Sequence, residues 1–161
     1  MKLFTQTLLD ELAARAAASP RGRAHHPVHG SDSDPVQRFF VAANRGSYFR
    51  PHRHVTRSEL TWVVRGAFTV LTFDSEGRVL ARYDVGGNSP ATGYEIPAGT
   101  WHTLLPQTDG ATFLEVKEGP YDPARSAEFA AWAPAERDPQ VATLLAWAHS
   151  AQPGEVAPRL A

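Results

Sequence analysis

Residues 46–66, GSYFRPHRHVTRSELTWVVRG, place two histidines one residue apart, His52 and His54, shortly before Glu59. The residues around them are rich in β-branched and aromatic types, which is typical of strands. Side chains at positions i and i+2 of a strand share a face, so both imidazoles point the same way, roughly 7 Å apart along the backbone. Two imidazoles at that spacing can bind one metal ion. The stretch therefore indicates a β-structure that carries a metal site.

The chain from residue 36 to residue 121 is a succession of short apolar segments separated by Gly, Pro, Asp and Ser. The segments are VQRFFVAA, ELTWVVRG, AFTVLTFD, RVLARYDV, YEIPAG, WHTLLP and ATFLEVKEG. Strand-like segments with no helical pattern between them predict a sandwich or a barrel. We therefore expect residues 36–121 to form one β-domain.

The flanking segments have other patterns. Residues 4–18 carry leucine and alanine at helical spacing and predict an amphipathic helix. The polar, basic and histidine-rich remainder of residues 1–35 is expected to be a loop or extended arm. Within residues 122–150, PARSAEFAAWAP and DPQVATLLAWAHS predict two helices that pack on the β-domain. Residues 151–161, rich in Pro, Ala and Gly, are expected to be a disordered tail.

Composition excludes several classes of function. With 161 residues, 42% of them hydrophobic, the chain suits one domain with a core. Its net charge of -1 and mixed charges give no field that recruits nucleic acid. The absence of cysteine excludes disulfides and thiolate sites. No run approaches the roughly 18 apolar residues of a membrane helix, and the N-terminus has no signal-peptide pattern. We expect a cytoplasmic protein without membrane or nucleic-acid partners.

A carboxylate and a further imidazole complete the predicted metal site. Glu59 follows VTRS, which can turn the chain, and its side chain would then point inward from the next strand. His102, in PAGTWH, supplies the other imidazole. Neutral nitrogens with one carboxylate suit one divalent transition metal (Fe, Mn, Zn or Ni) and leave one or two positions open for water or a substrate.

These residues resemble the two motifs of the cupin superfamily. The first motif reads G, five residues, H, one, H, three or four, E, six, G, and is matched by Gly46, His52, His54, Glu59 and Gly66. The second contains P-x-G-x-x-H, matched by Pro97, Gly99 and His102. Two positions differ from the second motif, and neither is a metal ligand. Gly93 stands three residues before Pro97 instead of five, and Pro106 replaces the usual asparagine. The resemblance implies a single cupin barrel, a jelly roll or double-stranded β-helix, with the ion held by His52, His54, Glu59 and His102.

A narrower resemblance is to the WbuC family of cupin-fold metalloproteins. It rests on SPRGRAHHPVH, DPVQRFF, YFRPHRH, EIPAGTWHTL, EVKEGPY and FAAWAP, which together span roughly residues 19–134. Members of that family are often associated with bacterial surface-polysaccharide gene clusters. The resemblance implies a metal-binding cupin and suggests a sugar or nucleotide-sugar substrate.

Basic side chains near the predicted site are candidates for substrate binding. RGRAHHPVH carries Arg21, Arg23, His25, His26 and His29 and forms either an arm over the barrel mouth that binds a phosphate or carboxylate, or a solvated loop. Arg38 and Arg50 are either inward arginines, which need an anion such as the substrate or Glu115, or rim arginines in contact with water.

The segment FLEVKEGPY offers acid and base groups. Alternation puts Phe113, Glu115 and Lys117 on one face of the strand, and Leu114 and Val116 on the other, core face. Glu115 and Lys117 either line the pocket as a catalytic acid and base or lie on the outer surface. Tyr121 is a third catalytic candidate if it reaches the mouth.

Several functions remain open at this stage. The first is an enzyme that isomerises or epimerises a small polar or sugar-like substrate, with the metal as Lewis acid. An Fe(II) oxygenase is equally compatible with the ligand set. The third is a non-catalytic protein that binds a sugar or another small ligand. We also expect a homodimer, formed through an edge strand and the N-terminal helix.

Overall fold

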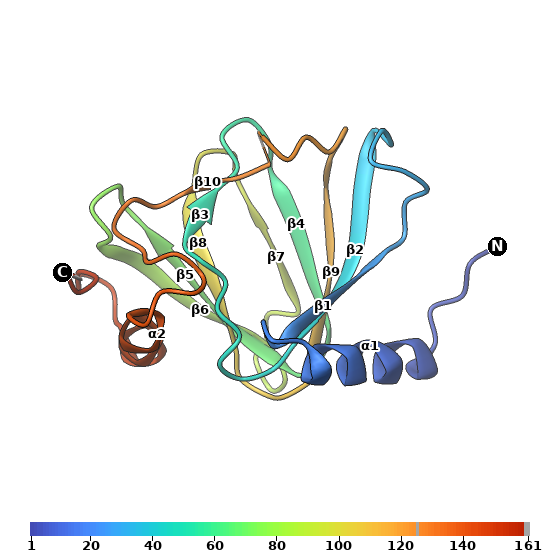
Figure 1. Ribbon diagram of the computed structural model, residues 1–161, viewed down its shortest axis with the longest axis horizontal. Helices are drawn as coiled ribbons and strands as arrows, with labels where there is room; N and C mark the ends of the chain where they lie inside the picture. Colours follow the sequence, from blue (N-terminus) through green and yellow to red (C-terminus); the bar gives the residue numbers. More distant parts are fainter. Residues whose placement is uncertain (125, 160–161) are drawn as a thin grey trace.

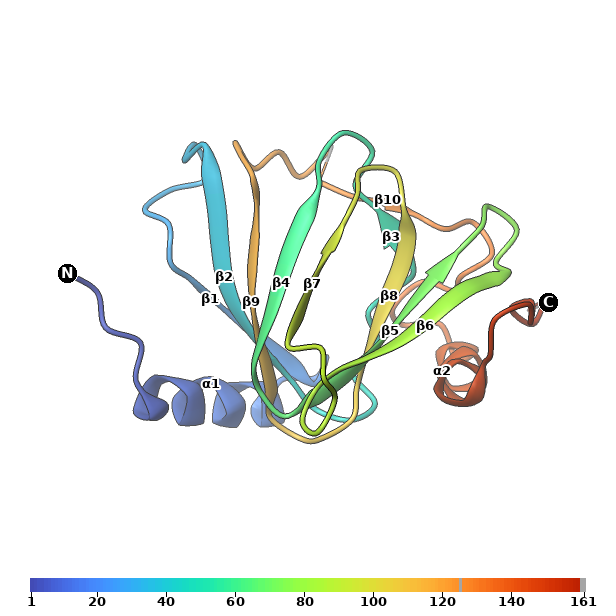
Figure 2. The ribbon, with the colours of Figure 1, turned by 180° about the vertical axis from the view of Figure 1, so that it is seen from behind.

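The computed structural model describes residues 1–124 and 126–159. Within these residues the strands form two five-stranded antiparallel sheets. The first sheet is ordered β1 (Arg23–Pro27), β2 (Val36–Ala43), β9 (Ala111–Glu118), β4 (Glu59–Arg65) and β7 (Gly93–Ile96). The second is ordered β10 (Glu128–Phe129), β3 (His52–Arg53), β8 (Trp101–Pro106), β5 (Ala67–Phe73) and β6 (Val79–Gly86). The two sheets face each other (Figures 1 and 2), and the predicted mainly-β jelly-roll fold is confirmed.

Strand β4 shows why these segments pair as they do. Its side chains alternate between buried positions and exposed positions, as the sequence pattern requires for a strand with one face on the core. Buried hydrophobic side chains from both sheets meet between them and form the barrel core. The members of this core are Val41, Ala43, Val63, Phe68, Val70, Val85, Ile96, Leu104, Ala111 and Phe113.

The interior changes from apolar to polar along the barrel. On β9, Phe113 belongs to the apolar core, whereas Glu115 and Lys117 line a cavity. On β4, Val63 belongs to the core, and Glu59 lies beside that cavity. The two sheets meet at one end and spread apart at the other (Figures 1 and 2). Polar side chains therefore gather at one end of the barrel, and the apolar core fills the other.

Gly66 makes the turn that returns the chain from β4 to β5. Its φ of 70° lies in the left-handed region that glycine adopts without strain. A Cβ at this position would approach the Cα of Ala111 to 3.1 Å. The glycine at the end of the first motif is thus required by both conformation and space.

The N-terminal helix α1 (Gln6–Ala18) covers the outer face of the first sheet. Thr5 caps it by accepting a hydrogen bond from the backbone of Leu8. Its buried side chains, Leu9, Leu12 and Ala16, pack against Ala24, Phe40 and Ala42 of β1 and β2. Leu114 packs against the same cluster, and Val116 is half-buried. Leu114 therefore packs in a hydrophobic core, as expected, but this core lies between the first sheet and α1, because the inner face of β9 is the Phe113 face.

The C-terminal region forms one of the two predicted helices. Helix α2 (Val141–Ser150) packs Leu144 and Ala148 against the outer face of the second sheet, together with Trp132 and Trp147. The helix expected for PARSAEFAAWAP is absent from the described residues of that segment. Glu128 and Phe129 pair with β3 instead, and the Ala130 N–H donates to the Pro51 carbonyl. Strand pairing thus satisfies backbone groups that a helix would have satisfied internally.

The ends of the predicted domains also differ from expectation. The histidine-rich arm contains β1, which pairs along its whole length with β2, so the barrel begins before residue 36. Residues 151–159 are not a disordered tail. The Val79 N–H donates to the Glu155 carbonyl, the Ala157 N–H donates to the Gly77 carbonyl, and Ala157 is buried. Residues 160–161 lie outside the described residues. Among those that are described, neither helix has the length and hydrophobicity of a membrane span.

Replacing Leu12 tests how firmly α1 is docked. The Leu12 side chain is 1% exposed, so Leu12→Ala leaves a cavity and should lower the free energy of unfolding by about 2–5 kcal/mol. Leu3→Ala is the matched control, because Leu3 is 71% exposed and its loss should change stability by about 0.5 kcal/mol or less. Urea denaturation measures both. Equal effects of the two substitutions would contradict the docking of this helix.

Candidate metal centre

Three histidines converge at the polar end of the barrel. His52 lies on β3 and His102 on β8, directly opposite each other in the antiparallel register, and His54 follows β3. One ring nitrogen of each lies within 4.8 Å of the other two. His54 and His102 are buried, and His52 is half-buried. The predicted spacing therefore does bring these imidazoles together, in an arrangement that is able to hold a metal ion.

The rings are oriented by backbone carbonyls. Each Nδ1 faces a carbonyl oxygen: that of Arg50 for His52 and of Thr100 for His102, both at 2.9 Å, and that of Ser126 for His54, at 2.5 Å. Because a carbonyl only accepts hydrogen bonds, Nδ1 carries the proton, and the Nε2 lone pairs of His52 and His102 remain for a ligand. The Nε2 of His102 is buried and has no hydrogen-bond partner among the described residues. This orphaned acceptor fits a metal ion.

Glu59 lies against the histidine cluster. Its Oε2 is 2.8 Å from the Nε2 of His54. The ring of His54 thus faces a carbonyl at Nδ1 and a carboxylate at Nε2. The first hydrogen bond needs a proton on Nδ1, and the second needs a proton either on Nε2 or on Glu59. A divalent ion held by His54 and Glu59 would replace one of these protons, as metal binding to protein sites generally does. The donor set predicted from the sequence, His52, His54, Glu59 and His102, is chemically suited to that ion.

Burial sets the charge states of the site. It lowers the pKa of His52 to about 3, with repulsion from His102 as a smaller cause, and it also lowers the pKa of His102. Both imidazoles are therefore neutral at pH 7, which is the form that binds metal. Burial alone would raise the pKa of Glu59, but the hydrogen bond with His54 and the charge of Lys117 outweigh it and lower this pKa. Glu59 is ionised.

Lys117 joins two carboxylates beside the histidines. The register places Lys117 opposite Glu59, and Glu115 opposite Thr61. Lys117 Nζ lies 2.5 Å from Glu115 Oε1 and 3.7 Å from Glu59 Oε2. Burial and the charge of Glu59 raise the pKa of Glu115. Burial lowers the pKa of Lys117, but the charges of Glu115 and Glu59 outweigh it and raise this pKa.

These groups open into a cavity with a volume of about 350 Å³. Its polar lining residues are Arg21, Arg23, His25, His29, Asp32, Gln37, His52, Glu59, Glu115, Lys117 and Tyr121, and its apolar ones are Pro27, Phe39, Val41, Phe49, Leu104 and Phe113. The volume lies at the lower end of the range for small-molecule sites in proteins. The cavity can therefore receive a small polar ligand against His52.

Several predicted substrate-binding and catalytic residues face this cavity. Arg23 and His25 line it from β1, and Glu115, Lys117 and Tyr121 line it from β9 and the chain after it. His29 also lines the cavity, but its Nδ1 bonds to the backbone of Arg38. That bond ties the end of β1 to β2, so the ring has a structural partner.

Other predicted substrate-binding residues lie elsewhere. His26 and Arg38 are not among the cavity-lining residues, because alternation along β1 and β2 turns their neighbours inward. Arg38 pairs with Asp34 at 3.7 Å. Arg50 lines a smaller adjoining cavity with His52, and its guanidinium donates to the carbonyls of Ala130 and Ala133. Backbone carbonyls therefore accept from Arg50 in place of Glu115, which was one of the anionic partners considered for it.

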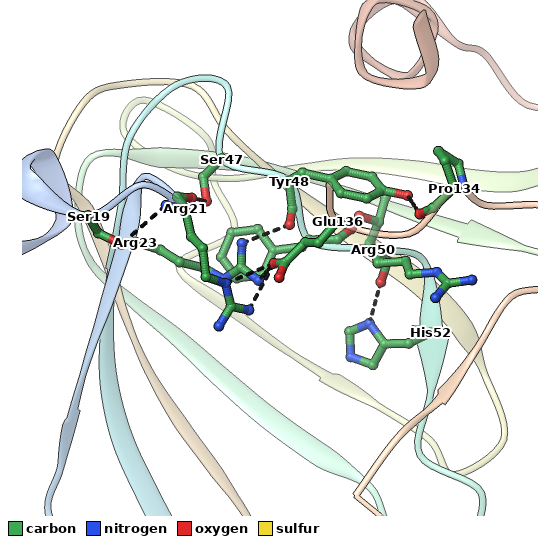
Figure 3. Close-up of polar contacts among 11 residues, drawn as sticks. Ser19, Arg21, Arg23, Ser47, Tyr48, Arg50, His52, Pro134 and Glu136 are labelled. Atoms are coloured by element: carbon green, nitrogen blue, oxygen red, sulfur yellow. Dashed lines mark hydrogen bonds and ion pairs between the residues drawn. The ribbon is translucent and has the colours of Figure 1, made fainter. Parts of the chain in front are cut away.

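Two residues of this region, Glu136 and Phe49, were not predicted from the sequence. Glu136 pairs with Arg21 and Arg23 (Figure 3). Phe49 lines the cavity, and the Arg23 guanidinium lies over its ring. Glu136 lies in a charged loop after Pro134, with no motif around it. Only the folding of that loop onto the barrel brings it to the arginines. Phe49 precedes His52 by three residues, so regular strand alternation would have placed the two side chains on opposite faces. Phe49 lies before β3 begins, and both residues line the cavity.

Solved structures with a similar fold include an oxalate decarboxylase and an oxalate oxidase. The chain is similar to oxalate decarboxylase from Bacillus subtilis, with 22% identity over 66% of this chain and 27% of that chain, and a TM-score of 0.51. It is similar to oxalate oxidase in complex with the substrate analogue glycolate, with 17% identity over 70% and 57% of the two chains and a TM-score of 0.51. KdgF from Halomonas sp. shares 24% identity over 65% and 84%, with a TM-score of 0.48.

The likeness to the decarboxylase and the oxidase shows that the fold is a cupin barrel. The chain spans about a quarter of the decarboxylase chain and just over half of the oxidase chain. The family model described as "Domain of unknown function (DUF6016)" matches residues 4–85, about half of this chain. A comparison with curated proteins finds no match.

Removing one imidazole tests the site directly. We expect protein purified without an affinity tag or chelator to contain about one equivalent of a transition metal. His102→Ala should lower the affinity for that metal by at least about 100-fold, because it removes a buried donor. His149→Ala is the control, since His149 is exposed near the end of α2. Elemental analysis by mass spectrometry gives the content. Equal metal in both variants would contradict the assignment.

Proposed function

The chain belongs to the DUF6016 family, and we propose that it is a metal-binding cupin that acts on a small polar or sugar-like substrate. His52, His54, Glu59 and His102 hold one divalent transition-metal ion in this proposal. The observation that carries it is the buried Nε2 of His102, which has no partner among the described residues, next to histidines whose Nδ1 atoms are already bonded. A buried acceptor without a partner is costly unless a ligand satisfies it.

We assign isomerisation or epimerisation as the reaction class. A bound divalent ion supplies Lewis-acid chemistry at a carbonyl or hydroxyl oxygen of the ligand. The reaction also requires that a proton is taken from a carbon atom and returned. Glu115 accepts that proton, and its raised pKa suits it to hold one. Lys117 orients the carboxylate through its 2.5 Å contact, and Tyr121 provides a hydroxyl at the cavity wall.

The substrate class follows from the cavity and from the sequence resemblance. A volume of about 350 Å³ accommodates a monosaccharide-sized ligand, and the lining carries several hydrogen-bonding groups. The resemblance to the WbuC family favours a sugar or nucleotide-sugar in bacterial surface-polysaccharide metabolism, which would be a cytoplasmic role. Arg23, His25 and His29 are the substrate-binding residues that this proposal retains.

One observation favours a non-catalytic alternative. Glu115 and Lys117 are already paired with each other, and Lys117 also lies near Glu59. Groups that satisfy one another in this way serve as well to shape and neutralise a binding site as to move protons. In the alternative, the protein binds its sugar or other small ligand without converting it.

Proton exchange in heavy water separates these two functions. We expect metal-loaded protein, incubated in D₂O with a panel of monosaccharides and nucleotide-sugars, to incorporate deuterium at a carbon of one compound, as detected by NMR. Glu115→Gln should slow this exchange by about 100-fold or more, because it removes the base. Glu118→Gln on the same strand is the matched control, since Glu118 is exposed.

The same samples give the control readouts. Metal content and ligand binding, measured by saturation-transfer NMR, should persist in Glu115→Gln. Binding of a compound without any exchange in the wild type would contradict catalysis and support the binding function.

We also propose a homodimer. β7 and β6 are the last strands of their sheets, and Trp62, 52% exposed, stands with Leu60 and Val64 on the outer face of β4 next to β7. An apolar face beside an edge strand is a common contact between subunits. Sedimentation should give twice the monomer mass, and Trp62→Glu should give the monomer. A wild type that sediments as a monomer at high concentration would contradict this.

A further inference from the structure

Arg21 and Arg23 converge on a single carboxylate oxygen. Arg21 Nη2 lies 2.8 Å from Glu136 Oε1, and the Nε of Arg21 donates to the same atom at 3.0 Å. Arg23 Nη2 donates to this oxygen as well. Figure 3 shows the two guanidinium groups side by side around the end of the Glu136 side chain. The arrangement is a two-arginine site for an anion, in which a side chain of the same protein is bound.

Arg23 is held by contacts other than the one to Glu136. Its Nη1 donates to the Tyr48 carbonyl at 2.8 Å, and its guanidinium carbon lies 4.9 Å from the centre of the Phe49 ring. The side chain is only 8% exposed. A buried guanidinium held by a carbonyl and an aromatic ring stays in place when its anionic partner changes. The site is therefore preformed on the barrel side.

Glu136 is held less firmly than Arg23. Its side chain is 34% exposed, and it belongs to the stretch 130–140, which contains no helix or strand. Arg21, on the outer side, is 55% exposed. The exposed pair of Arg21 with Glu136 contributes little to stability, about 1 kcal/mol or less. The buried guanidinium of Arg23 needs an anionic partner, and the anionic group of a ligand supplies one when it takes the place of Glu136. A ligand anion can therefore replace Glu136 at small cost.

The arginine site adjoins the metal centre. Arg21, Arg23, Phe49 and His52 line both the cavity of about 350 Å³ and the adjoining one of about 260 Å³. Glu136 lines only the smaller cavity and a third depression on the outer surface. An anionic group that takes the place of Glu136 would thus belong to a ligand whose remainder can extend toward His52.

Charge supports an anionic ligand. The acidic and strongly basic side chains that line the two cavities are Arg21, Arg23, Arg50 and Lys117 against Asp32, Glu59, Glu115 and Glu136. These charges balance, so one divalent ion leaves the region with an excess of positive charge. Displacement of Glu136 from the arginines increases that excess further. A ligand with one or two negative charges restores the balance.

We propose that Arg21 and Arg23 bind a carboxylate or phosphate group of the cavity ligand, and that Glu136 occupies this subsite in the ligand-free protein. The planar guanidinium matches the paired oxygens of both groups. The inference deepens the proposed function, on which it rests for the place of the ligand beside the metal centre. It narrows the substrate class to anionic small molecules, such as a sugar acid or a sugar phosphate.

Calorimetric titration with three matched probes tests the subsite: glucuronate, glucose 1-phosphate and uncharged glucose. Titrations use both metal-free and zinc-loaded protein. At least one charged probe should bind at least about tenfold more tightly than glucose, and Arg23→Gln should abolish that preference. The comparison of glucuronate with glucose 1-phosphate shows which anion the subsite takes. Equal affinity for glucose and both charged probes would overturn the inference.

The decisive result is whether replacing Glu136 strengthens or weakens binding of the charged probe. Because Glu136 competes with the ligand, Glu136→Gln should tighten binding of the charged probe about two- to fivefold. Glu128→Gln is the matched control, since Glu128 pairs with Arg53 at 2.9 Å and neither residue lines the two cavities. Weaker or unchanged binding in Glu136→Gln would mean that Glu136 only braces the loop, and would overturn the inference.

Two further variants keep the test independent of folding and of the metal. Arg23→Lys keeps the positive charge without the planar guanidinium, so it should bind the charged probe with intermediate affinity. Arg21→Gln removes the other guanidinium of the subsite at a side chain that is 55% exposed, so it leaves the fold intact. If metal-free protein shows the Arg23 and Glu136 effects but no metal binds, the subsite stands and the proposed function fails. If metal binds but both effects are missing, the subsite fails alone.

Discussion

The site depends on the carbonyl oxygens that fix the histidine rings. Two of them are local, since Arg50 and Thr100 each precede their histidine by two residues. The third belongs to Ser126, which is 72 residues from His54 in the sequence. The segment after β9 must therefore fold back over β3 before the third ring is oriented. Pairing of β10 with β3 and the bond from Ala130 to Pro51 hold that segment in place.

The same return of the chain builds the second half of the site. Past β10 the loop brings Glu136 to the arginines of the N-terminal segment, and Tyr48 donates a hydrogen bond to the Pro134 carbonyl within that loop. Residues far apart in the chain thus meet at the smaller cavity, where Arg21 and Arg23 contact Glu136 (Figure 3). Metal centre and arginine site share His52 as their common boundary. A ligand that contacts both would be oriented at two points.

Whether a feature could be predicted from the sequence depends on how far apart its interacting residues lie along the chain. His52, His54, Glu59 and His102 were accessible because the two-residue period of strands and two motifs fix their face. The same alternation put Glu115 and Lys117 on one face of their strand, but it left open whether that face lines the pocket or the outer surface. The orientation of the His26 and Arg38 side chains could not be predicted in this way, because the face that β1 and β2 turn inward depends on their register with β9. Local patterns also favoured a helix around Phe129, where pairing with β3 prevails, and they carried no signal for Glu136.

Anomalous diffraction from crystals grown with cobalt or zinc would test the central claim most directly. A single strong peak about 2.1 Å from the Nε2 atoms of His52, His54 and His102, and in contact with the Glu59 carboxylate, is the predicted result. It would also require that the hydrogen bond between His54 and Glu59 is broken. Ordered, well-resolved histidines with no peak among them, or a peak at His25 and His29 instead, would contradict the account.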